Sequence, residues 1–189
     1  LAGVVRAHVA AKEAGLKLIV GAEIVPVDGP SVVLLATNRD AYGRLSRLIT
    51  TGRRRAPKGE CRLKVADILE DAEGLLCCVP LSEESRIRFE RRYVPGIATD
   101  VTQERLQVYR DGFGDRCYGL AELHRGSNDL ERLHRWNSMC QRLSIPVVAA
   151  NDVHYHIPRR RALHDVVTAI RHATTLQSLG HELFPNGER

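Results

Sequence analysis

Short, continuously apolar segments alternate along this chain with segments in which apolar residues recur at helical spacing. The apolar segments are residues 16–24, 31–36, 74–81, 116–124 and 145–150. Strands buried on both faces have such solidly apolar sequences, whereas a strand with one face in water alternates apolar and polar residues. The pattern therefore predicts an α/β fold with parallel strands covered by helices, either an open sheet or an α/β barrel.

Helices are expected between these strands. Their expected ranges are 4–14, 38–50, 64–71, 82–95, 127–140 and 160–173. Asn38 or Asp40 is expected to cap the second helix and Ser127 the fifth, because their side-chain oxygens accept hydrogen bonds from the free N–H groups of a first turn. The order of helix and extended chain within residues 97–109 stays open.

The composition excludes several classes of protein. A chain of 189 residues with 43% hydrophobic and 27% charged side chains suits one globular domain or slightly more, and not a disordered or collagen-like chain. No apolar run reaches the ~20 residues of a membrane span, so no membrane partner is expected. The five cysteines are odd in number and lack C-x-x-C spacing. Together with the absence of a signal peptide, this favours a reducing cytoplasm.

The positive charge is concentrated in one part of the sequence. The formal net charge is +5, and the densest basic run comprises Arg53, Arg54, Arg55, Lys58, Arg62 and Lys64. Two interpretations stay open for this run. It contacts phosphate groups, in which case binding is sensitive to salt, or it is a solvated loop. A second run, Arg159 to Arg161, follows the last predicted strand and would suit a phosphate ester beside a metal ion.

Acidic residues and histidines lie at the ends of three of the predicted strands. They are Glu23, the pair Glu122 and His124, and the pair Asp152 and His154. In parallel α/β folds the reactive groups gather at the carboxyl ends of the strands. A D-x-H spacing on an extended segment points both side chains to one face, so Asp152 and His154 could share a divalent ion. Such an ion would lower the pKa of a bound water and polarise a phosphoryl oxygen.

Structural roles compete with these interpretations. An aspartate after the last strand often caps the next turn, which is the alternative for Asp152. For Glu122 and His124 the alternative is a solvated loop with a capping role. His164 and His172 are eight residues apart on a predicted helix, and a surface or helix-end position is favoured over a ligand role.

Several segments resemble the polymerase-and-histidinol-phosphatase (PHP) domain of bacterial C-family DNA polymerases, the polymerase III alpha type. They are residues 1–8, 34–45, Leu-Ile-Val-Gly-Ala-Glu at 18–23 and Ile-Pro-Val-Val-Ala-Ala-Asn-Asp-Val-His at 145–154. Residues 121–126 and 183–189 are similar to the error-prone branch, which is used in damage-induced mutagenesis and translesion synthesis. The resemblance runs in order over essentially the whole chain.

The resemblance implies a distorted (β/α) barrel that is incomplete at its N-terminus, because the H-x-H strand of such domains would precede Leu1. It implies a PHP domain at residues 1–175 and the start of a linker toward the polymerase region at 176–189. Only Glu23, Asp152 and His154 match the metal motif of these domains. A zinc or manganese site is therefore expected to be absent or partial, and these three ligands are expected to be vestigial.

The resemblance also implies what the longer protein does. It would be a DNA-directed DNA polymerase that works in the cytoplasm with template-primer DNA, dNTPs, a sliding clamp and accessory mutagenesis proteins. Its catalytic carboxylates and their magnesium would lie beyond Arg189, so no catalytic residue is expected in this segment, which would serve as a scaffold. The alternatives are a stand-alone metal-dependent PHP phosphoesterase and a non-catalytic interaction module.

Overall fold

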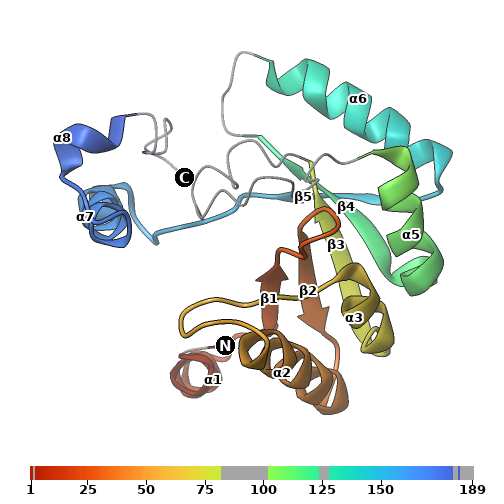
Figure 1. Ribbon diagram of the computed structural model, residues 1–189, viewed down its shortest axis with the longest axis horizontal. Helices are drawn as coiled ribbons and strands as arrows, with labels where there is room; N and C mark the ends of the chain where they lie inside the picture. The colour runs from red at the N-terminus through yellow and green to blue at the C-terminus, as the bar shows by residue number, and fades with distance from the viewer. Residues whose placement is uncertain (2, 82–101, 124–127, 181–182, 184–189) are drawn as a thin grey trace.

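A five-stranded mixed sheet forms the centre of the computed structural model, which describes residues 1, 3–81, 102–123, 128–180 and 183 (Figure 1). The strands are β1 (Gly21–Ile24), β2 (Val32–Ala36), β3 (Leu75–Pro80), β4 (Cys117–Glu122) and β5 (Val147–Ala150), and they lie in that order. The prediction of an α/β fold is confirmed. Within the described residues β1 and β5 are the two edges of the sheet, so no closed barrel is seen there.

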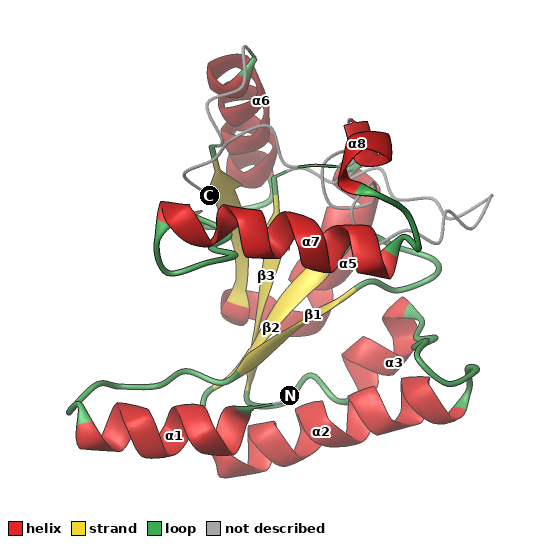
Figure 2. Ribbon diagram, turned by 90° about the vertical axis from the view of Figure 1, so that its left-hand side faces the viewer, coloured by secondary structure: helices red, strands yellow, loops and turns green. Residues whose placement is uncertain are grey.

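Helices connect these strands. They are α1 (Val4–Glu13), α2 (Arg39–Arg54), α3 (Val65–Glu70), α5 (Gln103–Phe113), α6 (Asp129–Arg142), α7 (Arg161–Arg171) and α8 (Leu176–Leu179), with 3-10 turns η1 (Gly114–Arg116) and η2 (Pro158–Arg160). In the described part of the chain, no helix combines the length and the apolar character needed to cross a membrane. Figure 2 shows α1 and α2 on one side of the strands and α6 at the far end of the sheet.

The prediction of a wholly parallel sheet is wrong at β2, which runs against the other four strands. β1 pairs with β2 in antiparallel fashion, with Gly21 opposite Leu35, and β2 pairs antiparallel with β3. β3 pairs parallel with β4, and β4 with β5, and β1 runs in the same direction as these three strands. The connection between β1 and β2 spans residues 25–31, which is too short for the crossover that parallel strands need.

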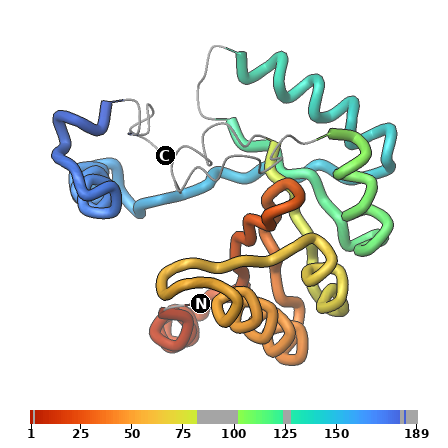
Figure 3. Tube along the Cα trace, in the orientation of Figure 1, coloured from red at the N-terminus to blue at the C-terminus, as the bar shows by residue number. Residues whose placement is uncertain are grey.

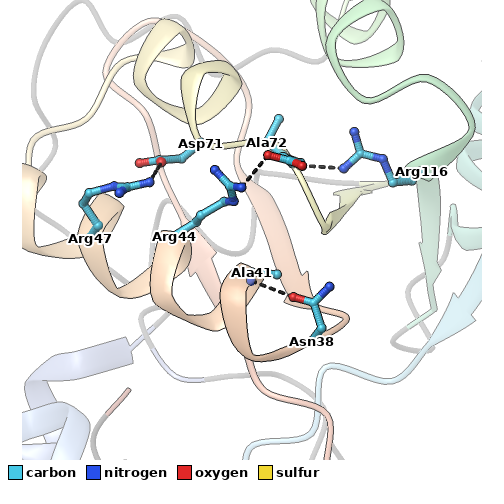
Figure 4. A network of polar contacts seen from close by, with 8 residues as sticks. Asn38, Ala41, Arg44, Arg47, Asp71, Ala72 and Arg116 are labelled. Carbon is cyan, nitrogen blue, oxygen red and sulfur yellow. Dashed lines mark hydrogen bonds and ion pairs between the residues drawn. The ribbon is translucent and has the colours of Figure 1, made fainter.

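Ion pairs join α2 to the chain that follows α3, just before β3 pairs antiparallel with β2. Arg47 on α2 forms an ion pair with Asp71, with its Nη2 2.6 Å from the aspartate Oδ1, and Arg44 pairs with Glu73 (Figure 4). These contacts hold the end of α3 beside α2. The chain re-enters the sheet at the end it had left, and Leu75 of β3 lies opposite the last residue of β2.

The expected helix starts and ends are confirmed in part. The side chain of Asn38 accepts a hydrogen bond from the backbone N–H of Ala41 at 2.8 Å and so caps α2 (Figure 4). This helix continues to Arg54, so residues 51–54, which the sequence placed in a loop, are helical. The predicted helix at 82–95, residues 97–101 and the capping role of Ser127 lie outside the described residues.

The core lies between the sheet and helices α2, α3, α5 and α6. Its largest fully buried side chains include Leu34, Leu45, Ile68, Leu106, Tyr109 and Phe113. The Tyr109 hydroxyl donates a hydrogen bond to the carbonyl oxygen of Pro30 at 2.9 Å, which ties α5 to the chain before β2. Cys77 and Cys78 are buried in β3, as their apolar surroundings in the sequence indicate.

Apolar side chains remain exposed at two places away from this core. α1 buries none of its residues, and Leu16 and Ile19 after it are 70% and 57% exposed. The predicted strand 16–24 therefore begins only at Gly21. On α7, which packs mainly on η2 and α8, Leu163 and Ile170 are also exposed.

Candidate functional site

Glu122 ends β4 at the carboxyl edge of the parallel part of the sheet. It lies opposite Ala150, the last residue of β5, so the two parallel strands end side by side. Glu122 is only 5% exposed, which excludes the solvated-loop alternative for this residue. His124, its proposed partner, lies outside the described residues.

Asp152 and His154 contact each other just beyond β5. The Nε2 atom of His154 lies 3.3 Å from Oδ2 of Asp152, and the two side chains are 25% and 16% exposed, respectively. The predicted proximity is confirmed, but the local backbone differs from the expected extended segment. Asp152 has a φ of 46°, in the left-handed region that aspartate tolerates better than most residues. The chain therefore turns at Asp152 rather than continuing the strand.

His164 on α7 joins these two residues. Its ring centroid lies 5.2 Å from that of His154 and 6.0 Å from that of Tyr155. Partial burial, followed by the nearby charge of His154, lowers the pKa of His164. His164 is half-buried rather than a simple surface histidine. Nine intervening residues, which pass through a loop and η2, left no periodicity to indicate its contact with His154.

Arginine and aspartate side chains flank this group on α7 and η2. Nε of Arg161 lies 3.7 Å from Oδ2 of Asp165, and Nδ1 of His164 lies 3.9 Å from Oδ1 of the same aspartate. Arg159 and Arg160 are exposed in η2. Arg159 and Arg160 therefore lie in the segment that follows Asp152 and His154. Arg161, which follows them at the start of α7, forms an ion pair with Asp165.

Glu23 does not join this group through the sheet. It is an exposed residue of β1, the edge strand opposite β5. Within residues 3–81, 102–123 and 128–180 no group of three or more His, Cys, Asp or Glu side chains is arranged to hold a metal ion. Asp152 and His154 supply two candidate ligands, whereas catalytic zinc sites use three and structural sites four. The metal role of Glu23, Asp152 and His154 stays a prediction.

The basic run divides into paired and unpaired cations. Nη1 of Arg55 donates hydrogen bonds to both carboxylate oxygens of Asp67, at 2.7 and 2.8 Å, and the backbone N–H of Lys64 donates to Oδ2 at 2.8 Å. The hydrogen bond from Arg55, and next that from Lys64, lower the pKa of Asp67. Arg55 thus contributes to the fold.

Four other cations of the run are exposed and form no ion pair with any residue that the structure describes. They are Arg53, Arg54, Lys58 and Arg62, which together are named the basic patch below. The first two lie in the last turn of α2 and the other two in the segment that follows it. The basic patch is the second candidate site.

Sequence comparison shows that the whole chain is similar to proteins named error-prone DNA polymerase. It is 44% identical over 191 residues to an error-prone DNA polymerase of Dechloromonas aromatica (strain RCB), and 43% identical over 189 residues to one of Pseudomonas syringae pv. tomato. A Rhodopirellula baltica protein of the same name is 39% identical over 189 residues. This chain is related over its full length to a segment of error-prone DNA polymerases.

The related segment is a small part of those polymerases. The alignments cover 100% of this chain but only 16–17% of each of the three relatives, so the chain spans about one sixth of their length. No protein-family model matches the chain. Its relationship therefore rests on these pairwise similarities.

Proposed function

We propose that this chain is the PHP-type domain of an error-prone DNA polymerase, in which it acts as a scaffold. The observation that carries the proposal is the uninterrupted similarity of the whole chain, at 39–44% identity, to polymerases of that name. The longer protein would carry out DNA-directed DNA synthesis in damage-induced mutagenesis and translesion repair. It would act in the cytoplasm on template-primer DNA and dNTPs, with a sliding clamp and accessory mutagenesis proteins.

The proposed domain is a distorted (β/α) barrel at residues 1–175, followed by the start of a linker at 176–189. The parallel strands β3, β4 and β5 support this, because they have the βα arrangement from which such barrels are built. Closure of the barrel would need further strands against the β1 edge. The proposal places those strands before Leu1, where PHP domains carry their H-x-H motif.

The proposed metal site is vestigial. Asp152 and His154 contact each other directly, and Glu23 lies on the opposite edge strand. Two adjacent ligands favour partial or absent binding of zinc or manganese over a complete site. The magnesium of nucleotidyl transfer would be held by carboxylates outside this segment, so the role of these residues is structural.

A stand-alone metal-dependent phosphoesterase is the second candidate. It is favoured by the contact between Asp152 and His154 and by the cations of η2 on the same connection. It would need the missing H-x-H ligands from a preceding segment.

The reading frame around this chain separates the two candidates. A polymerase frame continues well beyond Arg189, and its product extends a primer on a template when dNTPs and magnesium are present. A frame that supplies H-x-H upstream and stops near Arg189, with a product that hydrolyses a phosphoester such as p-nitrophenyl phosphate, contradicts the polymerase proposal.

A further inference from the structure

All of the net positive charge of the chain resides in one short segment. Residues 51–64 contain six basic residues and one acidic residue, a formal charge of +5 that equals the charge of the whole chain. Basic and acidic residues therefore balance in the rest of the molecule. Concentrated charge of one sign raises the local concentration of oppositely charged partners.

The fold itself uses only some of the cations in this region. Arg44, Arg47 and Arg55 form ion pairs with Glu73, Asp71 and Asp67. Lys64 lies near Asp67 and contributes to lowering its pKa, after the hydrogen bond from Arg55. The basic patch, as defined above, is what remains.

Close packing at Gly52 brings Arg62 to the end of α2. The backbone N–H of Arg62 donates a hydrogen bond to the carbonyl oxygen of Gly52 at 2.9 Å. A Cβ atom on Gly52 would lie 2.6 Å from Cys61 Sγ and 2.6 Å from Leu63 Cγ, so a larger residue would force these side chains to shift. Figure 3 shows the segment after α2 doubling back beside the helix. Arg62 is thereby placed next to the last turn of α2.

A structural role accounts for only half of the patch. Basic residues in the last turn of a helix interact favourably with its dipole, which explains Arg53 and Arg54. Lys58 and Arg62 lie outside any helix. Both are exposed, and neither has an acidic partner among the described residues. The fold gives no structural reason for these two cations.

We propose that the basic patch binds the phosphate backbone of duplex template-primer DNA, an inference that rests on the proposed polymerase function. Guanidinium groups bind phosphate oxygens through paired hydrogen bonds. Residues 51–64 contain no aromatic side chain on which an unpaired base could stack. Binding sites for single strands generally combine cations with such aromatics, so the patch fits the duplex backbone better. Its binding is independent of base sequence.

The test is the salt dependence of binding of the longer protein that contains this chain to a fluorescently labelled template-primer duplex. Each lost phosphate contact reduces the slope of log K against log salt concentration by about 0.9. The variant Arg53→Gln/Arg54→Gln/Arg62→Gln is expected to reduce the slope by about 3. The variant Lys58→Gln/Arg62→Gln carries no substitution in α2 and is expected to reduce the slope by about 2. It keeps the proposal testable if the first variant misfolds.

A matched control removes the same charge elsewhere. Arg6, Arg39 and Arg142 are exposed and form no ion pair with described residues, and Arg6→Gln/Arg39→Gln/Arg142→Gln should leave the slope nearly unchanged. Equal slopes for the wild type and both patch variants would overturn the proposal, as would equal losses in patch and control variants. If the basic patch binds an acidic protein instead of DNA, the slopes of the wild type and both patch variants will be equal.

Failure of the patch proposal can be distinguished from failure of the proposed function. If the longer protein extends primers while the slope is unchanged, the patch proposal fails and the polymerase proposal stands. If the slope falls as expected while the longer protein extends no primer, the patch binds DNA and the polymerase proposal fails.

Discussion

Gly119 of β4 packs directly against Cys140 of α6, so closely that a Cβ atom at position 119 would lie 2.8 Å from the cysteine sulfur. The same atom would lie 3.1 Å from the ring of Trp136. Cys140 and Trp136 are both buried, at 0% and 3% exposure. The contact fixes the distance between α6 and the strand that ends at Glu122, and so supports the carboxyl edge of the parallel strands.

Gly119→Ala should therefore destabilise the protein by about 1–3 kcal/mol, the usual cost of overpacking a close-packed core. The measurement is the free energy of unfolding from a urea titration. Gly43→Ala is the matched control, because Gly43 lies on the exposed side of α2 with nothing within 4 Å of a new Cβ. It should stabilise by about 0.5–1 kcal/mol. Equal effects of the two substitutions would contradict the packing described here.

Tyr109→Phe should cost about 1–2 kcal/mol. The substitution removes the buried hydrogen bond to the carbonyl oxygen of Pro30 and leaves that oxygen without this donor. Urea unfolding again provides the measurement, and Tyr42→Phe on the half-buried side of α2 provides the control. A loss no greater than that of Tyr42→Phe would show that the hydroxyl does not hold α5 to the chain before β2.

The contribution of Asp67 to stability should depend on pH. Its pKa lies below the ordinary value of 3.8 in the folded protein, chiefly because Arg55 and the backbone N–H of Lys64 donate to its carboxylate. A group with a depressed pKa in the folded state contributes its full stability above its unfolded pKa, and that contribution is lost as pH falls through the folded pKa.

Asp67→Asn should accordingly lower stability by roughly 0.5–1 kcal/mol at pH 7, the range for a helix-cap contact with an exposed cation. The difference from the wild type should shrink once the pH falls below 3.8. Thermal unfolding across pH 3 to pH 7 measures it. A difference that is constant over this range would mean that the ionised carboxylate contributes nothing.

The metal content of the purified chain should be well below one ion per molecule. Asp152 and His154 provide two adjacent ligands, and a tightly held divalent ion needs more. Plasma mass spectrometry after purification without chelator measures the content. Asp152→Ala should change it little, as should the control Asp111→Ala on α5. A full ion per chain that is lost only in Asp152→Ala would show that a metal site exists, and phosphoester hydrolysis should then be assayed.

The sequence predicted best those features that depend on local interactions. The cap of α2 depends on one side chain and its neighbouring N–H groups, and Asn38 forms it as expected. The buried strands β3 and β4 follow from apolar runs that only a covered sheet can accommodate, whereas β5 is partly exposed at the edge of the sheet. The position of Glu122 at the end of β4 follows from the same pattern.

The features that were not predicted depend on how distant segments return to one another. The apolar character of β1 and β2 gives no information on their relative direction, which the short connection at 25–31 makes antiparallel. The contact of His164 with His154 depends on the path of η2. The left-handed backbone of Asp152 likewise leaves no periodic trace in the sequence.

Primer extension by the longer polymerase tests the scaffold proposal most directly. The wild type is compared with Asp152→Ala/His154→Ala on a template-primer duplex with dNTPs and magnesium, and thermal unfolding of both proteins controls for folding. If the segment is a scaffold, both proteins extend the primer at the same rate apart from any loss that follows from reduced stability. A selective loss of extension by a normally stable variant would contradict it.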